Sequence, residues 1–357
     1  MRKPAFHDLK VAAIRRETAD AVSLTFDVPG DLHTAYRFTA GQYLTLRATI
    51  EGQDVRRSYS ICAAPDQGVL RVAVKQVAGG LFSTWVNTAL REGDVLSVMT
   101  PDGRFSLPKP MQPGRVVAAF AAGSGITPVL SVMQAVLAHE TDSRFFLFYG
   151  NRAADSIMFR QEIEDLKDCY LSRLSVFHVL SREQQDVPVL NGHLDADKVR
   201  LLMRTVLPVA AVDHALICGP QPMIEGLQPA LLALGLPRER VHVERFTPSL
   251  DGRPRPVVVA RDAAPAAVVT VIHEGARFDI PMAEQEAIID AAIRAGRNLP
   301  YSCKGGMCCT CRAKLVEGRV EMAVNYSLEP WELAAGYVLT CQARARTDRV
   351  VVDYDQV

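Results

Sequence analysis

Four cysteines crowd into nine consecutive positions near the end of the chain, in the sequence CKGGMCCTC at 303–311, and Cys341 follows after a further 29 residues. The spacing C-x4-C-x2-C with a distant fourth cysteine is the plant-type pattern of ligands to a [2Fe–2S] cluster. It predicts that Cys303, Cys308, Cys311 and Cys341 bind the metal. Cys309 occupies a position that the pattern does not use.

Four thiolates can converge on two irons only if the loop wraps tightly, and Gly305 and Gly306 provide the backbone freedom that this requires. A structural zinc site made of four cysteines is the alternative. Zinc sites usually contain two short Cys-x2-Cys pairs, whereas only Cys308 and Cys311 form one here. The spacing therefore favours the iron–sulfur cluster.

Composition places these cysteines in an ordinary globular protein. The chain has 357 residues, 48% of them hydrophobic and 22% charged, so two or three domains are expected. Its 40 basic residues balance 40 acidic ones without a basic block, and we expect no nucleic-acid partner. No apolar run reaches transmembrane length, so we expect a cytoplasmic protein with no membrane partner.

The first segment, residues 1–110, contains the short runs AVSLTFDV, QYLTLRATI, RRSYSICAAP and VLRVAVKQV. They predict a small antiparallel barrel. In RSYS, Arg57 and Tyr59 alternate to one face of a strand, where a guanidinium can pair with a phosphate and a phenol can lie against a flat ring. An ordinary strand with exposed polar residues is the alternative interpretation of RSYS alone.

A pair of glycines, Gly79 and Gly80, opens the expected short helix GLFSTWVNTAL, in which Ser83 and Thr84 can cap the first turn. A helix N-terminus that follows glycines suits a pyrophosphate. Together with RSYS, this turn predicts an aromatic cofactor that carries phosphate.

The second segment, residues 111–247, alternates apolar strands with helices. This order predicts a parallel sheet with helices on both faces and a binding site at the carboxyl ends of its strands. The stretch AGSGITP follows the first strand, where Gly123 and Gly125 permit a tight turn and Thr127 can cap the next helix. A glycine-rich turn without a ligand is the alternative.

Later strands of this segment end in further candidate residues. Ser181 and Arg182 stand where the ribose of an adenosine would reach, and an arginine there can pair with a 2′-phosphate, which favours NADPH over NADH. A solvated loop arginine is the alternative. Cys218 and Glu244 end two more strands; a lone buried cysteine is usually a small hydrophobic residue, and only its position at a strand end makes it a candidate.

The third segment follows a stretch of linker composition, TPSLDGRPRP, and we place the linker at 248–266. Residues 267–357 begin with a predicted β-hairpin, AVVTVIHEGARFDIPM, and a predicted helix in AEQEAIIDAAIRAG that Gly296 would end. The cysteine-rich loop lies in this segment.

In this order, RSYS, AGSGITP, CGP and PYSCKGGMCCTC resemble the ferredoxin–NADP reductase superfamily fused to a plant-type ferredoxin, over nearly the whole chain. Within that group, VLSREQQDVPVLNG and NYSLEPWELAAGYVLTCQA are most similar to the reductase subunits of phenylacetyl-CoA epoxidase complexes. The resemblance implies a multidomain fold with an antiparallel β-barrel flavin domain, an α/β parallel-sheet nucleotide-binding domain and an α+β β-grasp ferredoxin domain.

The resemblance also implies a role for each matching residue. Ser60 would lie near flavin N5, Cys218 near the nicotinamide, and Glu244 beside the flavin face, as the catalytic positions. Phe246 stands where plant-type reductases end in a stacking tyrosine. The residues matched to FAD are Arg57, Tyr59, Ser60, Lys75, Gly80, Ser83, Thr84 and Phe246, and those matched to the nicotinamide nucleotide are Gly123, Gly125, Thr127, Ser181 and Arg182.

The implied function is electron transfer from NADPH through FAD and the [2Fe–2S] cluster to a separate oxygenase component, in the epoxidation of phenylacetyl-CoA. The chain has no pair of E-x-x-H motifs of the kind that holds two irons, so we expect another protein to activate oxygen. One alternative is the reductase of a ring-hydroxylating or alkane oxygenase, with FMN as the flavin. Another is a non-catalytic adaptor with a zinc site, which would be colourless and indifferent to NADPH.

Overall fold

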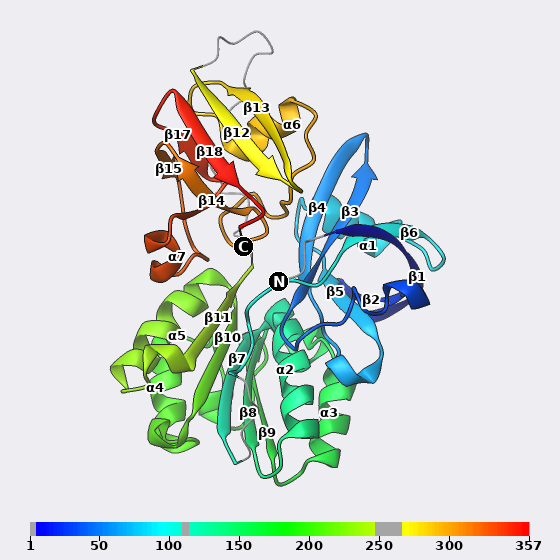
Figure 1. Ribbon diagram of the computed structural model, residues 1–357. Helices are drawn as coiled ribbons and strands as arrows, with labels where there is room; N and C mark the ends of the chain where they lie inside the picture. The colour runs from blue at the N-terminus through cyan, green and yellow to red at the C-terminus, as the bar shows by residue number, and fades with distance from the viewer. Residues whose placement is uncertain (1–4, 109–113, 247–265, 357) are drawn as a thin grey trace. The chain divides into compact units, whose positions relative to one another are not determined.

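The computed structural model describes residues 5–108, 114–246 and 266–356 (Figure 1). These residues form two compact units, Ala5–Phe246 and the C-terminal part from residue 266, and each is described by itself. The expected boundary at residue 110 and all but the last residue of the expected linker at 248–266 lie outside the described residues.

The first half of the larger unit is an antiparallel sheet of six strands in the order β4-β3-β6-β1-β2-β5. A bridge between Ile61 and Val72 joins the two edges of this curled sheet, as the predicted barrel requires. The elements are β1 (Phe6–Thr18), β2 (Ala21–Asp27), β3 (Tyr43–Ile50), β4 (Gln53–Ser60), β5 (Leu70–Lys75), α1 (Leu81–Thr88) and β6 (Val95–Met99).

The second half is a five-stranded parallel sheet in the order β11-β10-β7-β8-β9. Helices α2 and α3 cover one face and α4 and α5 the other, as predicted (Figure 1). The elements are β7 (Val116–Ala122), α2 (Ile126–His139), β8 (Arg144–Asn151), α3 (Arg160–Cys169), β9 (Leu174–Leu180), α4 (Ala196–Thr205), β10 (His214–Gly219), α5 (Gln221–Ala233) and β11 (Val241–Arg245).

Apolar side chains hold this sheet from both faces. On one face, the rings of Phe120, Phe148 and Phe177 stack across three neighbouring strands, with centroids 5.1 and 5.2 Å apart. Each such aromatic pair contributes about 0.5–1.5 kcal/mol beyond the area that it buries. The strand β7 is central and its residues Val116 to Ala121 are all buried, so its carboxyl end is rigidly placed.

The order of the strands reverses between β7 and β10. After β7 the chain adds β8 and β9 on one side, and after β10 it adds β11 on the other. Ligands of open α/β sheets bind in the crevice outside such a reversal. The turn Gly123–Gly125 lies there and packs directly on β10: a Cβ atom on Gly125 would stand 2.1 Å from the carbonyl oxygen of Cys218. Only glycine can occupy this position without moving the strand.

The C-terminal unit contains a mixed sheet in the order β13-β12-β18-β14-β16 and a two-stranded sheet, β15-β17. Helix α6 packs its buried residues Ile288, Ile289 and Ala292 into the core, and Gly296 follows it with a left-handed backbone. The elements are β12 (Ala267–His273), β13 (Ala276–Met282), α6 (Ile288–Arg294), β14 (Arg312–Glu317), β15 (Val320–Met322), α7 (Pro330–Ala334), β16 (Tyr337–Leu339), β17 (Ala343–Ala345) and β18 (Arg349–Asp353).

Among the described residues, no helix combines the length and the apolar character that crossing a membrane demands.

Candidate functional site

The glycine turn at the end of β7 connects this strand tightly to α2, as the sequence predicted. Gly123 has φ +53°, and its carbonyl oxygen accepts a hydrogen bond of 2.9 Å from the buried hydroxyl of Tyr149. Thr127 is buried, but its hydroxyl donates to the carbonyl oxygen of Ser124 at 3.0 Å, and Gly125 is the residue that caps α2. The expectation that Thr127 caps the helix is therefore wrong. A hydroxyl used as a donor to a carbonyl cannot also donate to a ligand.

Cys218 and Glu244 lie side by side at the carboxyl ends of β10 and β11, where their Cα atoms are paired in register. Burial raises the pKa of the Cys218 thiol well above its usual range, and the Glu244 carboxylate adds to this effect. Burial also raises the pKa of Glu244 to about 8, with a further contribution from Asp102. Near neutral pH this carboxyl group holds its proton. Phe246 follows β11 and packs against the core cluster that contains Cys218.

Ser181 and Arg182 follow β9 at the same edge of the sheet. The Ser181 N–H donates to the carbonyl oxygen of Asn151 at 3.0 Å, and the Arg182 N–H donates to that of Arg152 at 2.8 Å. The two arginines are thus held on adjacent backbones, and both are exposed. Arg152 was not among the residues predicted from the sequence. It directly follows the run RFFLFYGN, at the carboxyl end of a strand, where the other candidate residues were also found.

On the barrel, the strand β4 places Arg57 and Tyr59 on one side, both half-buried, and Ser60 at its buried end. The Tyr59 ring lies 5.9 Å from that of Phe82, and burial raises the pKa of its hydroxyl. Arg57 donates to the carbonyl oxygen of Arg56 at 2.7 Å. The alternation expected from the sequence is therefore present, with an aromatic face and a guanidinium on the same side.

The glycine turn before α1 lies next to the end of β5. Gly80 precedes the helix, and the Thr84 N–H donates to its carbonyl oxygen at 3.0 Å. The N–H groups between these two residues come before the first hydrogen bond of the helix and have no partner inside it. Lys75 ends β5, and its Nζ lies 3.5 Å from Asp20. This backbone suits an anion.

The expected capping by Ser83 and Thr84 is wrong. The hydroxyl of Ser83 accepts from the Val77 N–H at 3.1 Å and donates to the Gly80 carbonyl oxygen at 3.2 Å, while Thr84 accepts from Gln76 at 3.3 Å. The helix has no side-chain cap. These hydroxyls shape the turn and leave the helix N-terminus open.

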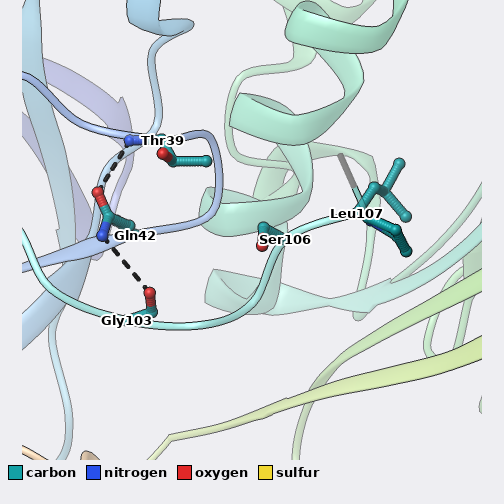
Figure 2. Close-up of a pocket in the computed structure, with 6 residues that line it drawn as sticks. Thr39, Gln42, Gly103, Ser106 and Leu107 are labelled. Atoms are coloured by element: carbon teal, nitrogen blue, oxygen red, sulfur yellow. Dashed lines mark hydrogen bonds between the residues drawn. The ribbon is translucent and has the colours of Figure 1, made fainter. Parts of the chain in front are cut away.

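A pocket of about 380 Å³ lies in the barrel half of the larger unit, and Figure 2 shows the Gln42 side chain between Thr39 and Gly103 at its wall. The Thr39 N–H donates to Gln42 Oε1 at 2.8 Å, and the Gln42 carbonyl oxygen accepts from the Ile61 N–H, one residue after Ser60. None of the residues predicted from the sequence lines the cavity, whose walls are Thr39, Gln42, Gly103, Ser106, Leu107 and Pro108.

In the C-terminal unit the four cysteines of the predicted cluster come together as two pairs. The Cys308 thiol donates to the Cys303 sulfur, which lowers the pKa of Cys303 and raises that of Cys308. Cys311 pairs with Cys341, which raises the pKa of Cys311, and the charges of Cys308 and Cys303 add to the shift. All four sulfur atoms are therefore close enough to influence one another.

Backbone and amide donors reach these sulfur atoms, as thiolate ligands of a cluster require. The Gly305 N–H lies 3.3 Å from Cys303 Sγ, and Gln342 Nε2 lies 3.5 Å from Cys341 Sγ. Gly306 has φ +74°, with Val324 and Gln342 packed closely around its α-carbon. Cys309 is half-exposed, with φ +54°.

The donor set fits two metal ions better than one. Over the ranges 5–108, 114–246 and 266–356, no three His, Cys, Asp or Glu side chains gather as they would around a single ion. The spacing C-x4-C-x2-C with a distant fourth cysteine matches the ligands of a cluster with two irons, whereas zinc sites usually contain two short Cys-x2-Cys pairs. The residues present therefore fit the [2Fe–2S] group.

Comparison with known protein families assigns each segment. Residues 8–107 match the oxidoreductase FAD-binding domain, residues 120–228 the oxidoreductase NAD-binding domain, and residues 271–346 the 2Fe-2S iron-sulfur cluster binding domain. The predicted fold class, with a flavin barrel, a parallel nucleotide-binding sheet and a ferredoxin domain, is confirmed, as are FAD and the cluster as cofactors.

Similar proteins of known activity match over almost their full length. The chain is 46% identical, over 98% of both sequences, to one of the subunits of the 1,2-phenylacetyl-CoA epoxidase of Escherichia coli K12. It is 35% identical to the ferredoxin reductase component of 3-ketosteroid-9-alpha-monooxygenase from Rhodococcus rhodochrous, over 97% of this chain and 96% of that one. Among solved structures, phthalate dioxygenase reductase covers 98% of both chains, with a TM-score of 0.61 and 25% identity.

These matches confirm the resemblance that the cysteine spacing and the two glycine turns suggested. The chain belongs to the ferredoxin–NADP reductase superfamily, in the family of electron-transfer reductase components of oxygenases that join FAD-binding, NAD-binding and [2Fe–2S] ferredoxin domains in one polypeptide.

Proposed function

We propose that this reductase transfers electrons from NADPH to the oxygenase component that epoxidises phenylacetyl-CoA, and that it does so in the cytoplasm. The observation that carries the proposal is the 46% identity, over 98% of both chains, to a component of the Escherichia coli 1,2-phenylacetyl-CoA epoxidase. The reductase of a steroid monooxygenase is the second candidate, because the identity to one such reductase is 35% over 97% of this chain. We place the domain boundaries at residues 110 and 247, with a linker at 248–266.

When bound, FAD accepts a hydride from the nicotinamide and releases single electrons, which the cluster accepts one at a time. The chain supplies binding and orientation. Arg57 and Lys75 provide positive charge for the FAD phosphates, and the open N-terminus of α1 after Gly80 adds backbone donors. Tyr59 provides a flat face, and Ser60 ends the same strand. Ser83 and Thr84 shape the turn.

The nicotinamide nucleotide is assigned to the carboxyl edge of the parallel sheet. Gly123 and Gly125 let its pyrophosphate approach the backbone, with Thr127 supporting the turn from below. Ser181 and Arg182 bind the 2′-phosphate, and Arg152 joins them because its backbone is bonded to that of Arg182.

At the reaction centre the chain orients the nicotinamide and controls a proton. Cys218 packs as a neutral thiol, and Glu244 holds a proton near neutral pH. Phe246 packs beside them and borders the flavin face. In the other unit, Cys303, Cys308, Cys311 and Cys341 would hold the cluster as its four thiolate ligands.

Reconstitution tests the function. The purified reductase, NADPH and the oxygenase subunits of a phenylacetyl-CoA epoxidase should together convert phenylacetyl-CoA, with NADPH consumed in proportion to product. The same reductase mixed with a 3-ketosteroid 9α-monooxygenase oxygenase serves as the control. Turnover with the steroid system and none with phenylacetyl-CoA would establish the second candidate instead.

Arg182→Ala should raise the KM for NADPH by about 10- to 100-fold, because it removes a charge-assisted partner of the 2′-phosphate. The KM for NADH should stay within about twofold of the wild-type value. Steady-state flavin reduction with the two nucleotides measures both constants. An equal loss with NADH and NADPH would show that Arg182 has another role.

Glu244→Gln should remove a pH dependence. The wild-type carboxyl group is neutral below its pKa of about 8 and becomes an anion above it. Flavin reduction by NADPH should therefore slow as the pH rises from 7 to 9 in the wild type and change little in the glutamine variant, which stays neutral throughout. Rapid-mixing kinetics across that range provides the measurement, and parallel pH profiles for the two proteins would count against a protonated Glu244.

Cys309→Ala should retain the cluster, whereas Cys308→Ala should lose it. Cys308 is hydrogen-bonded to Cys303 within the thiol group, and Cys309 sits half-exposed on a left-handed residue beside it. Iron and sulfide content, the visible spectrum and the EPR signal of the reduced protein provide the readouts. If both variants stay equally brown, the ligand assignment is wrong.

A further inference from the structure

A charged junction joins the barrel to the nucleotide-binding sheet inside the larger unit. Its centre is Glu162 on the first turn of α3. Arg71 Nη2, from the barrel strand β5, donates to Glu162 Oε1 at 2.7 Å, and Gln134 Nε2, from α2, donates to the same oxygen at 2.7 Å. Arg15 Nη2, from β1, reaches Glu162 Oε2 at 3.5 Å. One carboxylate therefore connects two strands of the barrel with two helices of the sheet.

Arg71 is held in one orientation by three partners. The same Nη2 that binds Glu162 donates to the carbonyl oxygen of Cys62 at 2.8 Å, and the guanidinium carbon lies 5.4 Å from the centre of the Phe159 ring. The side chains of Arg71 and Glu162 are only 15% and 20% exposed. At this burial the pair is weakly screened by solvent, and removing either charge leaves the other with weaker partners.

The backbone before α3 is strained in a way that serves this contact. Phe159 has a left-handed backbone, with φ +58°, although it is a large buried residue. Such a conformation costs about 1–3 kcal/mol and persists only where the surroundings enforce it. It places the aromatic ring against Arg71 and starts α3 so that Glu162 falls in the first turn, where the helix dipole favours an acidic side chain.

The junction is attached to the elements that hold both cofactors. Cys62, which binds Arg71, follows Ser60 by two residues, and the carbonyl oxygen of Ala63 accepts from the hydroxyl of Ser131 on α2 at 2.7 Å. Helix α2 begins directly after Gly125 of the nucleotide turn. The segment that follows β4 is thus joined to α2 through Ser131, and Arg71 is joined to α2 through Glu162 and Gln134.

We propose that Glu162 is a positioning residue: through Arg71 and Gln134 it sets the angle between the barrel and the parallel sheet, and so the approach of the nicotinamide to the flavin. The inference rests on the reductase activity and not on the identity of the oxygenase. Hydride transfer depends steeply on alignment, and a misplacement of about 1 Å can slow a reaction by about 100-fold. A residue remote from both cofactors can therefore act on the rate alone.

The test compares Glu162→Gln with Glu164→Gln in the full-length holoprotein. Both substitutions remove one charge from α3, but the ion partner of Glu164 is its helix neighbour Arg160, at 2.9 Å on the exposed face. Rapid mixing with NADPH under anaerobic conditions gives the limiting rate of flavin reduction and the half-saturating concentration separately. In Glu162→Gln we expect the rate to fall by about 10- to 100-fold, with half-saturation and FAD content unchanged. In Glu164→Gln all three should match the wild type.

A second variant keeps the test independent of stability. Gln134 Oε1 is buried without a hydrogen-bond partner among the residues described. Gln134→Met removes this unpaired acceptor and also one donor to Glu162 Oε1, which keeps Arg71 as a donor, so the unfolding temperature should stay close to that of the wild type. We expect flavin reduction to slow nonetheless, and hydrogen exchange to increase at residues 62–72 and 159–163.

Three results would overturn the proposal: wild-type rates in both junction variants, an equal loss in Glu164→Gln, or a slower reaction that only tracks lost FAD or weaker NADPH binding. Light-driven reduction of the flavin bypasses NADPH, and it therefore distinguishes failure of the positioning proposal from failure of the proposed reductase function. Transfer from the photoreduced flavin to the cluster should be unaffected in every variant. A wild-type protein that NADPH does not reduce at all would instead refute the reductase assignment itself.

Discussion

A glycine pressed against a neighbouring strand is the contact on which the nucleotide half of this protein depends. Any side chain at Gly125 would overlap the carbonyl oxygen of Cys218, because a Cβ atom there would stand 2.1 Å from it. With no side chain, the turn after β7 rests on β10, and α2 begins at the edge of the sheet where the order of the strands reverses. Cys218 and Glu244 then lie at the same edge, so the close approach brings the glycine turn and these two candidate residues together.

The barrel relies on a similar close approach. A Cβ atom on Gly41 would stand 1.6 Å from the carbonyl oxygen of Phe105, so this turn also requires glycine. In the C-terminal unit the constraint is different, because thiol groups must converge. The loop achieves this with a left-handed backbone at Lys304, Gly306 and Cys309 and with N–H donors aimed at sulfur. Next to the predicted ligand Cys311, the buried Arg312 pairs with Glu332 of α7 and so connects this loop to that helix.

Local patterns predicted most of the elements. The alternating runs marked β2 to β5, and the shift to longer apolar periods marked β7 and α2. The elements that the sequence did not predict include β1 and α4. In β1 only Leu9, Val11 and Thr18 are buried, so the strand lacks an apolar pattern. The helix α4 has a clear signal, since Asp195 caps it by accepting from the Lys198 N–H at 2.8 Å, and its apolar residues recur with helical spacing.

The sequence by itself determined the chemistry of the chain: the spacing of Cys303, Cys308, Cys311 and Cys341, the glycine turns and the order of the three domains are all short-range features, and short-range features can be interpreted without a fold. Only the tertiary structure decided how these parts are aligned. It placed Arg152 beside Arg182, turned the hydroxyl of Ser83 away from capping, and joined Arg71 to Glu162 across 91 residues. Such contacts depend on which faces pack together, and packing is a property of the whole fold that no local pattern encodes.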